Sequence, residues 1–433
     1  LMKSKKTANE DAWEKLFEEY NIIEKINKDG IFQISADQIK EHREPRLMAK
    51  FDHSINLPEI FHQNHLSILP ITRGYYVIAP INTYAKFETT HRNITHLSLP
   101  DSIESLSATN IPTETIAINC AYASGILSDF LEEPNLMPTV SGRMGSENFS
   151  FFINDTRKDG KFKIEVDSSQ IEIDAAYEGG RSLNLIEAKR DIADDFLVRQ
   201  LYYPYRTWNG RISKTVRPIY LVYSNGIFML YEYVFKNPDF YNSLELVKQK
   251  NYSIEDTAIG INEIEEIVHN KRVQKEPEIP FPQADSFERV INLCELLDGN
   301  NSCLTREEVT ENYAFDVRQT NYYTDAGRYL GLIDKSKNDS GDPCYFLTTE
   351  GHRIMRLPFR ERQLAFCSKI LKHRIFKDIF KIYLSQGSLP DRNAIIKKMA
   401  KAKLYNVGSI STMARRASTI RGWLNWIVEL TQM

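Results

Sequence analysis

Cysteine is scarce in this chain, and its spacing carries no motif. The 433 residues contain five cysteines, Cys120, Cys294, Cys303, Cys344 and Cys367, an odd number without a CxxC pair. Disulfide frameworks and structural zinc sites use cysteines in even numbers and at regular spacings. The cysteines therefore predict a protein of the reducing cytosol, without a disulfide framework or a zinc cluster.

Long apolar runs, Gly-rich phosphate loops and Ser/His/Asp sets are also missing. No run approaches the ~18 apolar residues of a membrane span, and the basic residues 1–6 are followed by polar residues, not by the apolar stretch of a secretory signal. The closest histidine pairs, His62 with His65 and His91 with His96, have no third ligand nearby in the sequence. We therefore expect a cytoplasmic protein with no membrane segment and no ATP-driven motor.

Charge is distributed very unevenly along the chain, although the formal net charge is only −3. Residues 351–433 contain 17 Lys+Arg and 4 Asp+Glu, a net of +13, so the first 350 residues hold the other 38 and 54, a net of −16. A basic C-terminal segment on an acidic body is the electrostatic signature of a polyanion-binding protein. The alternative is a solvated helical surface rich in lysine.

Hydrophobic periodicity and turn residues divide the chain into several units. The length of 433 residues predicts about three domains. Residues 10–45 predict two helices, the second with Ser35 as its N-cap, and residues 66–88 predict short strands. Residues 147–235 alternate polar and apolar side chains in several strands around one helix. The segment 274–283 contains three prolines and predicts a linker.

Beyond this linker, three predicted helices precede a strand, a polar loop and a second strand, which is the order of a winged helix. The remaining residues are nearly all helical in pattern. We expect a multi-domain protein of the α+β or α/β class. The predicted boundaries are 1–135 for a mixed α/β N-terminal domain with a possible role in recognition, 136–273 for an α/β core, 274–283 for the linker, 284–358 for a winged-helix-like domain and 359–433 for a basic helical domain.

Three charged residues stand at the ends of two apolar runs in the α/β core. Asp174 follows "QIEI", and Glu187 and Lys189 end "SLNLIEAK", with a turn at residues 178–180 between the runs. Residues two apart on a strand share a face, so Glu187 and Lys189 point the same way. The turn would fold the two runs antiparallel and bring Asp174 near Glu187.

Two carboxylates and an ammonium in one small site need compensation, because like charges repel and burial disfavours charged forms. A divalent cation supplies it, and Mg²⁺ prefers one or two carboxylates together with water and phosphate oxygens. Asp174 and Glu187 are the predicted ligands, with the Ala188 carbonyl as a third. The metal would lower the pKa of a bound water, and Lys189 would assist that water. The alternative is an exposed hairpin with a salt bridge.

The pattern of Asp174, twelve residues and then Glu187-Ala188-Lys189 resembles the motif of the PD-(D/E)XK nuclease superfamily, with Ile173 in place of its proline. The resemblance implies a mixed-sheet nuclease core at 136–273. It also implies an auxiliary acid before the first strand, for which Glu147 is the candidate. A glutamine on the helix after the motif would be Gln200.

The wider chain resembles the type II restriction endonucleases that join this core to additional DNA-binding modules. The resemblance implies Mg²⁺-dependent, sequence-specific cleavage of double-stranded DNA in a bacterial cytoplasm. It also implies a homodimer, at least on DNA, and a cognate DNA methyltransferase as a functional rather than a physical partner. Two alternatives remain open, namely a structure-specific nuclease of repair or recombination and a non-catalytic winged-helix transcriptional regulator.

Candidate DNA contacts lie on the third helix of the winged-helix-like domain, in the basic C-terminal segment and in one N-terminal loop. Arginine, asparagine and glutamine suit base edges, and lysines and arginines suit phosphates. The candidates are Arg318, Gln319, Thr320, Asn321, Tyr322 and Arg328 on the helix, Lys397, Lys398, Lys401, Lys403, Arg415, Arg416 and Arg421 in the segment, and Arg43 and Arg46 in the loop. The alternatives are a polar helix of a protein–protein module and solvated charges. Trp423 and Trp426 share one helical face and are predicted to lie in the core.

Overall fold

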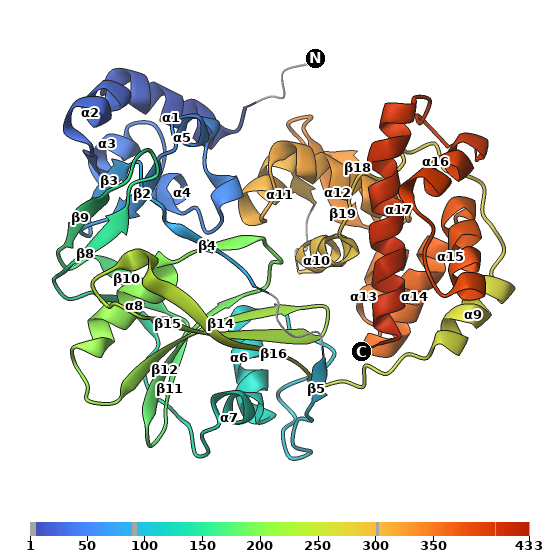
Figure 1. The fold of residues 1–433 in the computed structure, drawn as a ribbon, viewed down its shortest axis with the longest axis horizontal. Helices are drawn as coiled ribbons and strands as arrows, with labels where there is room; N and C mark the ends of the chain where they lie inside the picture. The colour runs from blue at the N-terminus through green and yellow to red at the C-terminus, as the bar shows by residue number, and fades with distance from the viewer. Residues whose placement is uncertain (1–5, 89–92, 300–302, 403, 433) are drawn as a thin grey trace.

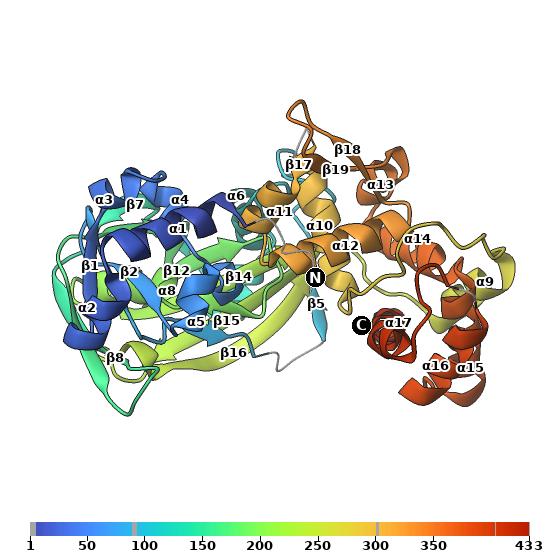
Figure 2. The same ribbon diagram turned by 90° about the horizontal axis from the view of Figure 1, so that it is seen from above.

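The computed structural model describes residues 6–88, 93–299, 303–402 and 404–432. It is a multi-domain arrangement of helices and a mixed sheet, with an N-terminal unit above the sheet and a helical C-terminal body beside both (Figure 1). Seen from above, α15, α16 and α17 lie at the end opposite the N-terminal unit (Figure 2). Among the described residues, no helix is both long and apolar enough to cross a membrane.

The N-terminal unit packs short helices on a three-stranded antiparallel sheet in the order β1-β3-β2. Trp13 and Phe61 meet edge to face in its core, with ring centroids 4.9 Å apart. The predicted N-cap at Ser35 is confirmed, because its side chain accepts a hydrogen bond from the backbone N–H of Gln38. The elements are α1 (Ala8–Glu19), α2 (Ile22–Asp29), β1 (Phe32–Ser35), α3 (Ala36–Lys40), α4 (Pro45–Ala49), η1 (Ser54–Asn56), α5 (Glu59–Gln63), β2 (Ser67–Pro70) and β3 (Tyr75–Ala79).

The core unit is built on a seven-stranded mixed sheet in the order β5-β16-β15-β14-β12-β11-β6. The strands of this sheet are β5 (Ile94–His96), β6 (Met137–Pro138), β11 (Ala175–Glu178), β12 (Ser182–Lys189), β14 (Thr215–Ser224), β15 (Ile227–Phe235) and β16 (Leu244–Ser253). The other strands of the core unit form two-stranded sheets, namely β4 (Tyr84–Lys86) with β13 (Asp195–Leu197), β7 (Gly142–Gly145) with β10 (Gln170–Ile173), and β8 (Phe149–Asn154) with β9 (Lys161–Val166). Its helices are α6 (Glu114–Ala123), α7 (Ile126–Leu131), α8 (Arg199–Asn209) and η2 (Tyr241–Ser243).

Helices cover both faces of this sheet, as can be followed in Figure 1. On one face Ile186 and Ala188 of β12 share a hydrophobic cluster with α6 and α7. On the other face Leu183 and Leu185 share a cluster with α8. The predicted strands of this region are present, and the hairpin between β14 and β15 turns at Asn225 and Gly226, which both have positive φ.

The C-terminal body is largely helical, and it contains a small three-stranded sheet in the order β17-β19-β18. Its elements are α9 (Ile261–Asn270), α10 (Phe287–Asp298), β17 (Leu304–Thr305), α11 (Arg306–Asn312), α12 (Val317–Tyr329), β18 (Ile333–Lys337), β19 (Pro343–Leu347), α13 (Thr349–Met355), α14 (Phe359–Leu371), α15 (Arg374–Gln386), α16 (Arg392–Lys401) and α17 (Ile410–Leu430). After the segment 274–283, the three helices α10, α11 and α12 thus precede the strand–loop–strand of β18 and β19, in the order that the sequence predicted.

The structure divides the chain at other places than the composition indicated. Helices α6 and α7 lie inside the predicted N-terminal domain 1–135 but pack on the core sheet. Helix α9 lies inside the predicted core 136–273 but packs against α14 and α15. The predicted domains 284–358 and 359–433 share one hydrophobic core, because helices from both ranges bury their apolar faces against each other.

The proline-rich segment 274–283 is packed against the C-terminal body and does not extend into solvent. The backbone N–H of Gln274 donates to the carbonyl of Lys372 at 2.9 Å, and Phe281 is 1% exposed. Just after it, the indole N–H of Trp423 on α17 donates to the carbonyl of Ala284 at 2.7 Å. The prolines at 274–283 therefore belong to a segment that lies along the surface of the C-terminal body, and this segment is not a free linker.

One disulfide joins Cys303 to Cys344, whose Cα atoms are 5.5 Å apart. The sequence predicted no disulfide framework, because the number of cysteines is odd and no CxxC pair occurs; the two bonded cysteines are 41 positions apart. Pairing of β17 with β19 places the two residues together, since Leu304 is the register partner of Tyr345. The other three cysteines are free and buried.

Helix α17 lies very close to the backbone at Asp285, and a substitution on the helix tests this contact. A Cβ atom at Gly422 would lie 2.1 Å from the carbonyl oxygen of Asp285. We expect Gly422→Ala to lower the free energy of unfolding by about 1–3 kcal/mol, because backbone must move to relieve the overlap. Urea unfolding measures the change. Gly408→Ala is the matched control, because nothing lies within 4 Å of its added Cβ; equal stability of both variants would contradict the packing.

Candidate active site

Strand β12 carries Glu187 and Lys189 through the middle of the sheet, and all eight of its residues are buried. It pairs antiparallel with β11 and parallel with β14. Ile186 and Ala188 point to the α6 and α7 face, so Glu187 and Lys189 share the opposite face, as the spacing predicted. The exposed hairpin that the sequence left open as an alternative is therefore not what the strand forms.

Asp174 lies in the single-residue step between β10 and β11. Ala175 is the register partner of Ile186, so position 174 falls opposite Glu187. Its Oδ2 atom accepts a hydrogen bond from the backbone N–H of Ala188 at 2.8 Å. The structure thus brings Asp174, Glu187 and Lys189 together at neighbouring strand ends.

Glu187 and Lys189 form a buried pair in which Nζ donates to Oε1 at 2.5 Å, with side chains 9% and 11% exposed. Burial raises the pKa of Glu187 to about 8; Lys189 opposes that shift, and the Asp174 carboxylate adds to it. Burial alone would lower the pKa of Lys189, but Glu187, Asp52 and other anionic groups raise it above its ordinary value. A buried, protonated lysine amid several carboxylates is a common mark of a functional site.

Two further acids act on this pair electrostatically and were not found from the sequence. Glu114 lies in the first turn of α6, where burial raises its pKa, Lys189 lowers it, and Asp174 and Asp191 raise it. Asp191 follows Lys189 by two residues. The sequence signal that could have placed Glu114 in the first turn of a helix was the N-cap residue Thr113, whose side chain accepts a hydrogen bond from the backbone N–H of Ile116.

His53 of the N-terminal unit reaches the same place and is 4% exposed. Its Nδ1 donates to the carbonyl of Asp195 and its Nε2 donates to Oδ2 of Asp191, both at 2.5 Å. A ring that donates from both nitrogens carries two N–H groups and a positive charge, and these two oxygen neighbours favour that form. Burial alone would lower the pKa of His53, but the hydrogen bond to Asp191 raises it above its ordinary value. His53 thus fixes the carboxylate next to Lys189.

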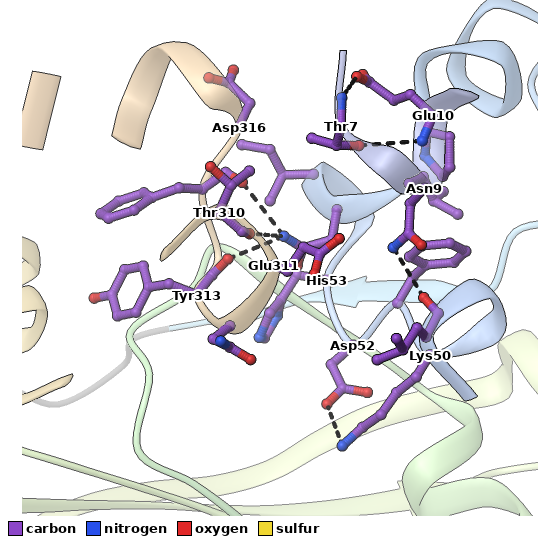
Figure 3. A pocket seen from close by; sticks show the side chains of 18 of the residues that line it. Thr7, Asn9, Glu10, Lys50, Asp52, His53, Thr310, Glu311, Tyr313 and Asp316 are labelled. Carbon is purple, nitrogen blue, oxygen red and sulfur yellow. Dashed lines mark hydrogen bonds and ion pairs between the residues drawn. The ribbon is translucent and has the colours of Figure 1, made fainter. Parts of the chain in front are cut away.

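A cavity of about 720 Å³, lined by His53, Lys189 and Asp191, lies where the three parts of the chain meet; Asp174 and Glu187 are not among its lining residues. Side chains of the N-terminal unit, among them Lys50 and Asp52, surround the same cavity as Thr310 and Tyr313 of the C-terminal body (Figure 3). The core contributes Glu114, Lys189 and Asp191 to its wall. The cavity is large enough for part of a substrate beside the charged strand ends.

Contacts between the N-terminal unit and the C-terminal body border this cavity. The side-chain amide of Asn56 donates to the carbonyl of Tyr313 at 3.1 Å and lies 3.4 Å from those of Thr310 and Phe315. Arg43 pairs with Glu311 at 3.0 Å. Arg43 therefore links the two parts, and Arg46 lines the cavity wall.

Of the two other predicted catalytic residues, Glu147 lies at the surface and Gln200 lies on the helix where it was expected. Glu147 is exposed, and its Oε1 pairs with Arg211 at 2.7 Å. Gln200 lies on α8, and its Oε1 atom is buried without a hydrogen-bond partner among the described residues. Glu114 is thus the acid whose charge acts on Lys189 and Asp174, whereas Glu147 faces an arginine at the surface.

The donor set fits Mg²⁺ better than a transition metal. Among the described residues, no group of three or more His, Cys, Asp or Glu side chains is arranged to hold a metal ion. Asp174, just before β11, and Glu187 on β12 are two hard carboxylates opposite each other in the register of adjacent strands. Mg²⁺ is commonly held by one or two carboxylates while water and phosphate complete its coordination.

The predicted base-reading helix corresponds to α12, which begins behind the N-cap Asp316. Arg318 is exposed in its first turn, and Gln319, Asn321 and Tyr322 are half-buried. Thr320 is fully buried, and its hydroxyl lies 2.8 Å from that of Thr310, so it serves the core and is not available to DNA. Arg328 is paired with Asp325 at 2.8 Å.

The basic C-terminal candidates divide into exposed and structural residues. Lys397, Lys401, Arg415 and Arg421 are exposed, and Lys398 is half-buried; Lys403 lies outside the described residues. Arg416 is half-buried, and its guanidinium donates to Gln283. Trp423 and Trp426 are 0% and 4% exposed, which confirms their predicted place in the core.

Three family models match consecutive parts of this chain, and each is described as a domain of unknown function. Residues 10–78 match DUF6996, residues 79–253 match DUF6997 and residues 289–432 match DUF7226. No curated protein and no solved structure matches the chain. The three ranges follow the N-terminal unit, the core and the C-terminal body. The charged groups around Lys189 come from the first two ranges, and residues of the third line part of the cavity.

The titration of His53 predicts how the stability of the folded protein depends on pH. The pKa of His53 is higher in the folded protein than in the unfolded chain, where it is about 6.5. Protonation of His53 therefore stabilises the fold fully below about pH 6.5, and this contribution is lost as the pH rises through the folded-state pKa. Burial alone would raise the pKa of Asp191, but His53 and Lys189 lower it below its ordinary value, so the contribution of Asp191 is lost only in acid. We expect His53→Gln to lower the free energy of unfolding by about 3 kcal/mol near pH 6. The difference from wild type is expected to shrink towards pH 9.

Urea unfolding between pH 5.5 and 9 measures this difference. His352→Gln is the matched control, because His352 and Asp298 form a pair at 2.7 Å that is only half-buried, with side chains 40% and 32% exposed. A constant difference across the pH range would show that His53 acts only through packing.

Proposed function

We propose that the protein is a Mg²⁺-dependent DNA endonuclease related to the PD-(D/E)XK nucleases and that it acts as a type II restriction enzyme. The observation that carries the proposal is the convergence of Asp174, Glu187 and Lys189 at neighbouring strand ends beside a large cavity. A Glu/Lys pair buried this deeply is weak evidence for a stabilising role, because desolvation offsets most of the attraction. A catalytic role accounts for its position.

The order of elements around the pair supports the same proposal. In the nucleases that the motif resembles, an earlier helix often supplies an acid, and α6 presents Glu114 towards Lys189. Helix α8 follows the motif strand and holds Gln200. The order of α10, β17, α11, α12, β18 and β19 is that of a winged helix, which supports DNA binding by the C-terminal body.

Asp174, Glu187 and the Ala188 carbonyl would hold the Mg²⁺, which when bound lowers the pKa of a water and offsets charge on the phosphate. Lys189, held as an ammonium by its neighbours, would orient that water or donate a hydrogen bond to a phosphate oxygen. Glu114 would accept a proton or position the water. Hydrolysis joins the oxygen of water to phosphorus, breaks the bond to the leaving sugar oxygen and protonates that oxygen.

The charges that are open to solvent agree with a DNA substrate. Arg318 at the start of α12 suits a base edge or phosphate, and Lys397, Arg415 and Arg421 add sequence-independent phosphate contacts. A cut through both strands needs two active sites, which favours a dimer on DNA.

Incubation with one long DNA and Mg²⁺ tests the proposal: discrete bands are expected. Structure-dependent nicking would favour a repair nuclease, and binding without cutting would favour a regulator.

Lys189→Ala is expected to reduce cleavage by at least about 10³-fold, because the ammonium would act where negative charge develops in the transition state. Circular dichroism and gel-shift binding are expected to remain near wild type. Lys163→Ala is the matched control, since Lys163 pairs with Glu165 two residues away on a strand, but at the surface and at 2.8 Å. Cleavage by Lys189→Ala at the rate of Lys163→Ala would remove the assignment.

Glu114→Gln and Glu147→Gln separate the two candidates for the auxiliary acid. Because Glu114 interacts with Lys189 and Asp174, its substitution is expected to lower kcat by roughly 10–100-fold, the usual effect of losing a supporting group. Glu147→Gln, which affects an exposed pair with Arg211, is expected to leave kcat within about twofold of wild type. Single-turnover cleavage measures both, and the reverse ranking would return the role to Glu147.

A further inference from the structure

Tyr220 stands on β14 directly opposite the motif strand. It is the register partner of Glu187, and its side chain belongs to the same hydrophobic cluster and face as Leu185. The ring packs against Phe196 and Phe87, with centroids 4.8 Å and 5.2 Å away. The residue is 0% exposed. These ring contacts fix the phenol, so the position of its hydroxyl is set by packing.

The hydroxyl of Tyr220 has no hydrogen-bond partner among the described residues. Leaving such a group buried and unpaired costs about 1–3 kcal/mol, and phenylalanine would fill the same space without that cost. The groups that interact with the phenol electrostatically are Lys189, Glu187, Asp191 and Asp52. Its polar end therefore lies among the charges of the candidate active site.

Lys189 has a reason to need a second acceptor. Its Nζ atom donates to Oε1 of Glu187, and Glu187 is also a proposed ligand of Mg²⁺. If Glu187 held a cation with its oxygens, the buried ammonium would lose its closest acceptor. The oxygen of Tyr220 lies on the same face of the adjacent strand and can accept a hydrogen bond from an ammonium.

We propose that Tyr220 is a positioning residue, whose hydroxyl accepts a hydrogen bond from Lys189 once Glu187 binds the cation and so directs the ammonium at the phosphate. This inference rests on the proposed nuclease function and adds to it a residue outside the Asp-Glu-Lys motif. It accounts for a tyrosine at a buried position where the hydroxyl otherwise only costs stability.

Tyr233 provides a matched control on the neighbouring strand β15. It is 5% exposed, its hydroxyl is also buried without a hydrogen-bond partner among the described residues, and its ring also packs on Phe196, at 5.3 Å. The titratable groups that act on it are Tyr231 and Glu88 and do not include Lys189 or Glu187. Tyr233→Phe therefore removes the same atom from the same core without touching the candidate site.

The experiment compares Tyr220→Phe with Tyr233→Phe in the full chain. For Tyr220→Phe we expect kcat for cleavage of duplex DNA to fall by about tenfold or more, with KM within about twofold, because a supporting group is lost while DNA contacts remain. Stability of both metal-free variants in urea is expected to equal or exceed that of wild type. A purely structural role for the hydroxyl predicts no change in kcat.

A second readout needs neither DNA nor catalysis. Addition of Mg²⁺ is expected to change the near-ultraviolet absorption of a tyrosine in wild type and in Tyr233→Phe, and this change is expected to be absent in Tyr220→Phe. If wild type cleaves DNA while Tyr220→Phe matches it in kcat and in the difference spectrum, the inference is overturned alone. If wild type cleaves no DNA with Mg²⁺, the proposed function is overturned and this inference with it.

Discussion

Antiparallel pairing of β11 with β12 is the constraint on which the candidate site depends. The register of Ala175 with Ile186 places position 174 opposite Glu187, and the hydrogen bond from the N–H of Ala188 to Asp174 holds that carboxylate at the strand end. A shift of one residue would turn Glu187 and Lys189 towards α6 and α7. Because β12 is buried on both faces, its hydrophobic residues prevent such a shift, and the apolar sheet thereby fixes the charged groups.

The charged groups come from more than one part of the chain, which gives the N-terminal unit a role beyond packing. His53 crosses from that unit to fix Asp191 beside Lys189, and Asp52 raises the pKa of Lys189 together with Glu187. The C-terminal body closes the other side of the cavity through Thr310 and Tyr313. A fragment limited to the core sheet would therefore lack part of the wall around the proposed catalytic lysine.

Sequence reasoning succeeded where the local pattern determines the structure. Alternating side chains predicted the strands of the core, the spacing of Glu187 and Lys189 predicted their common face, and the three-residue spacing of Trp423 and Trp426 predicted a buried pair. It failed where long-range packing decides. Glu114 was missed because α6 is apolar on most sides and gives little amphipathic signal, and only the fold brings its first turn to Lys189.

The predicted boundaries and the disulfide show the same limit. Prolines at 274–283 predicted a linker, but buried Phe281 and the contact of Trp423 with Ala284 join this segment to the C-terminal body. Cys303 and Cys344 meet only because β17 pairs with β19. In both cases composition describes the local chain correctly, while tertiary contacts determine its role.

Binding of one divalent cation by Asp174 and Glu187 is the central claim, and Mn²⁺ in place of Mg²⁺ makes it directly measurable. Electron paramagnetic resonance can count bound Mn²⁺ on the full chain with a DNA duplex, using wild type and Asp174→Asn. The account predicts Mn²⁺ held by wild type and lost in the variant, while both bind the duplex equally. Equal Mn²⁺ binding by the two proteins, or none by wild type, would contradict it.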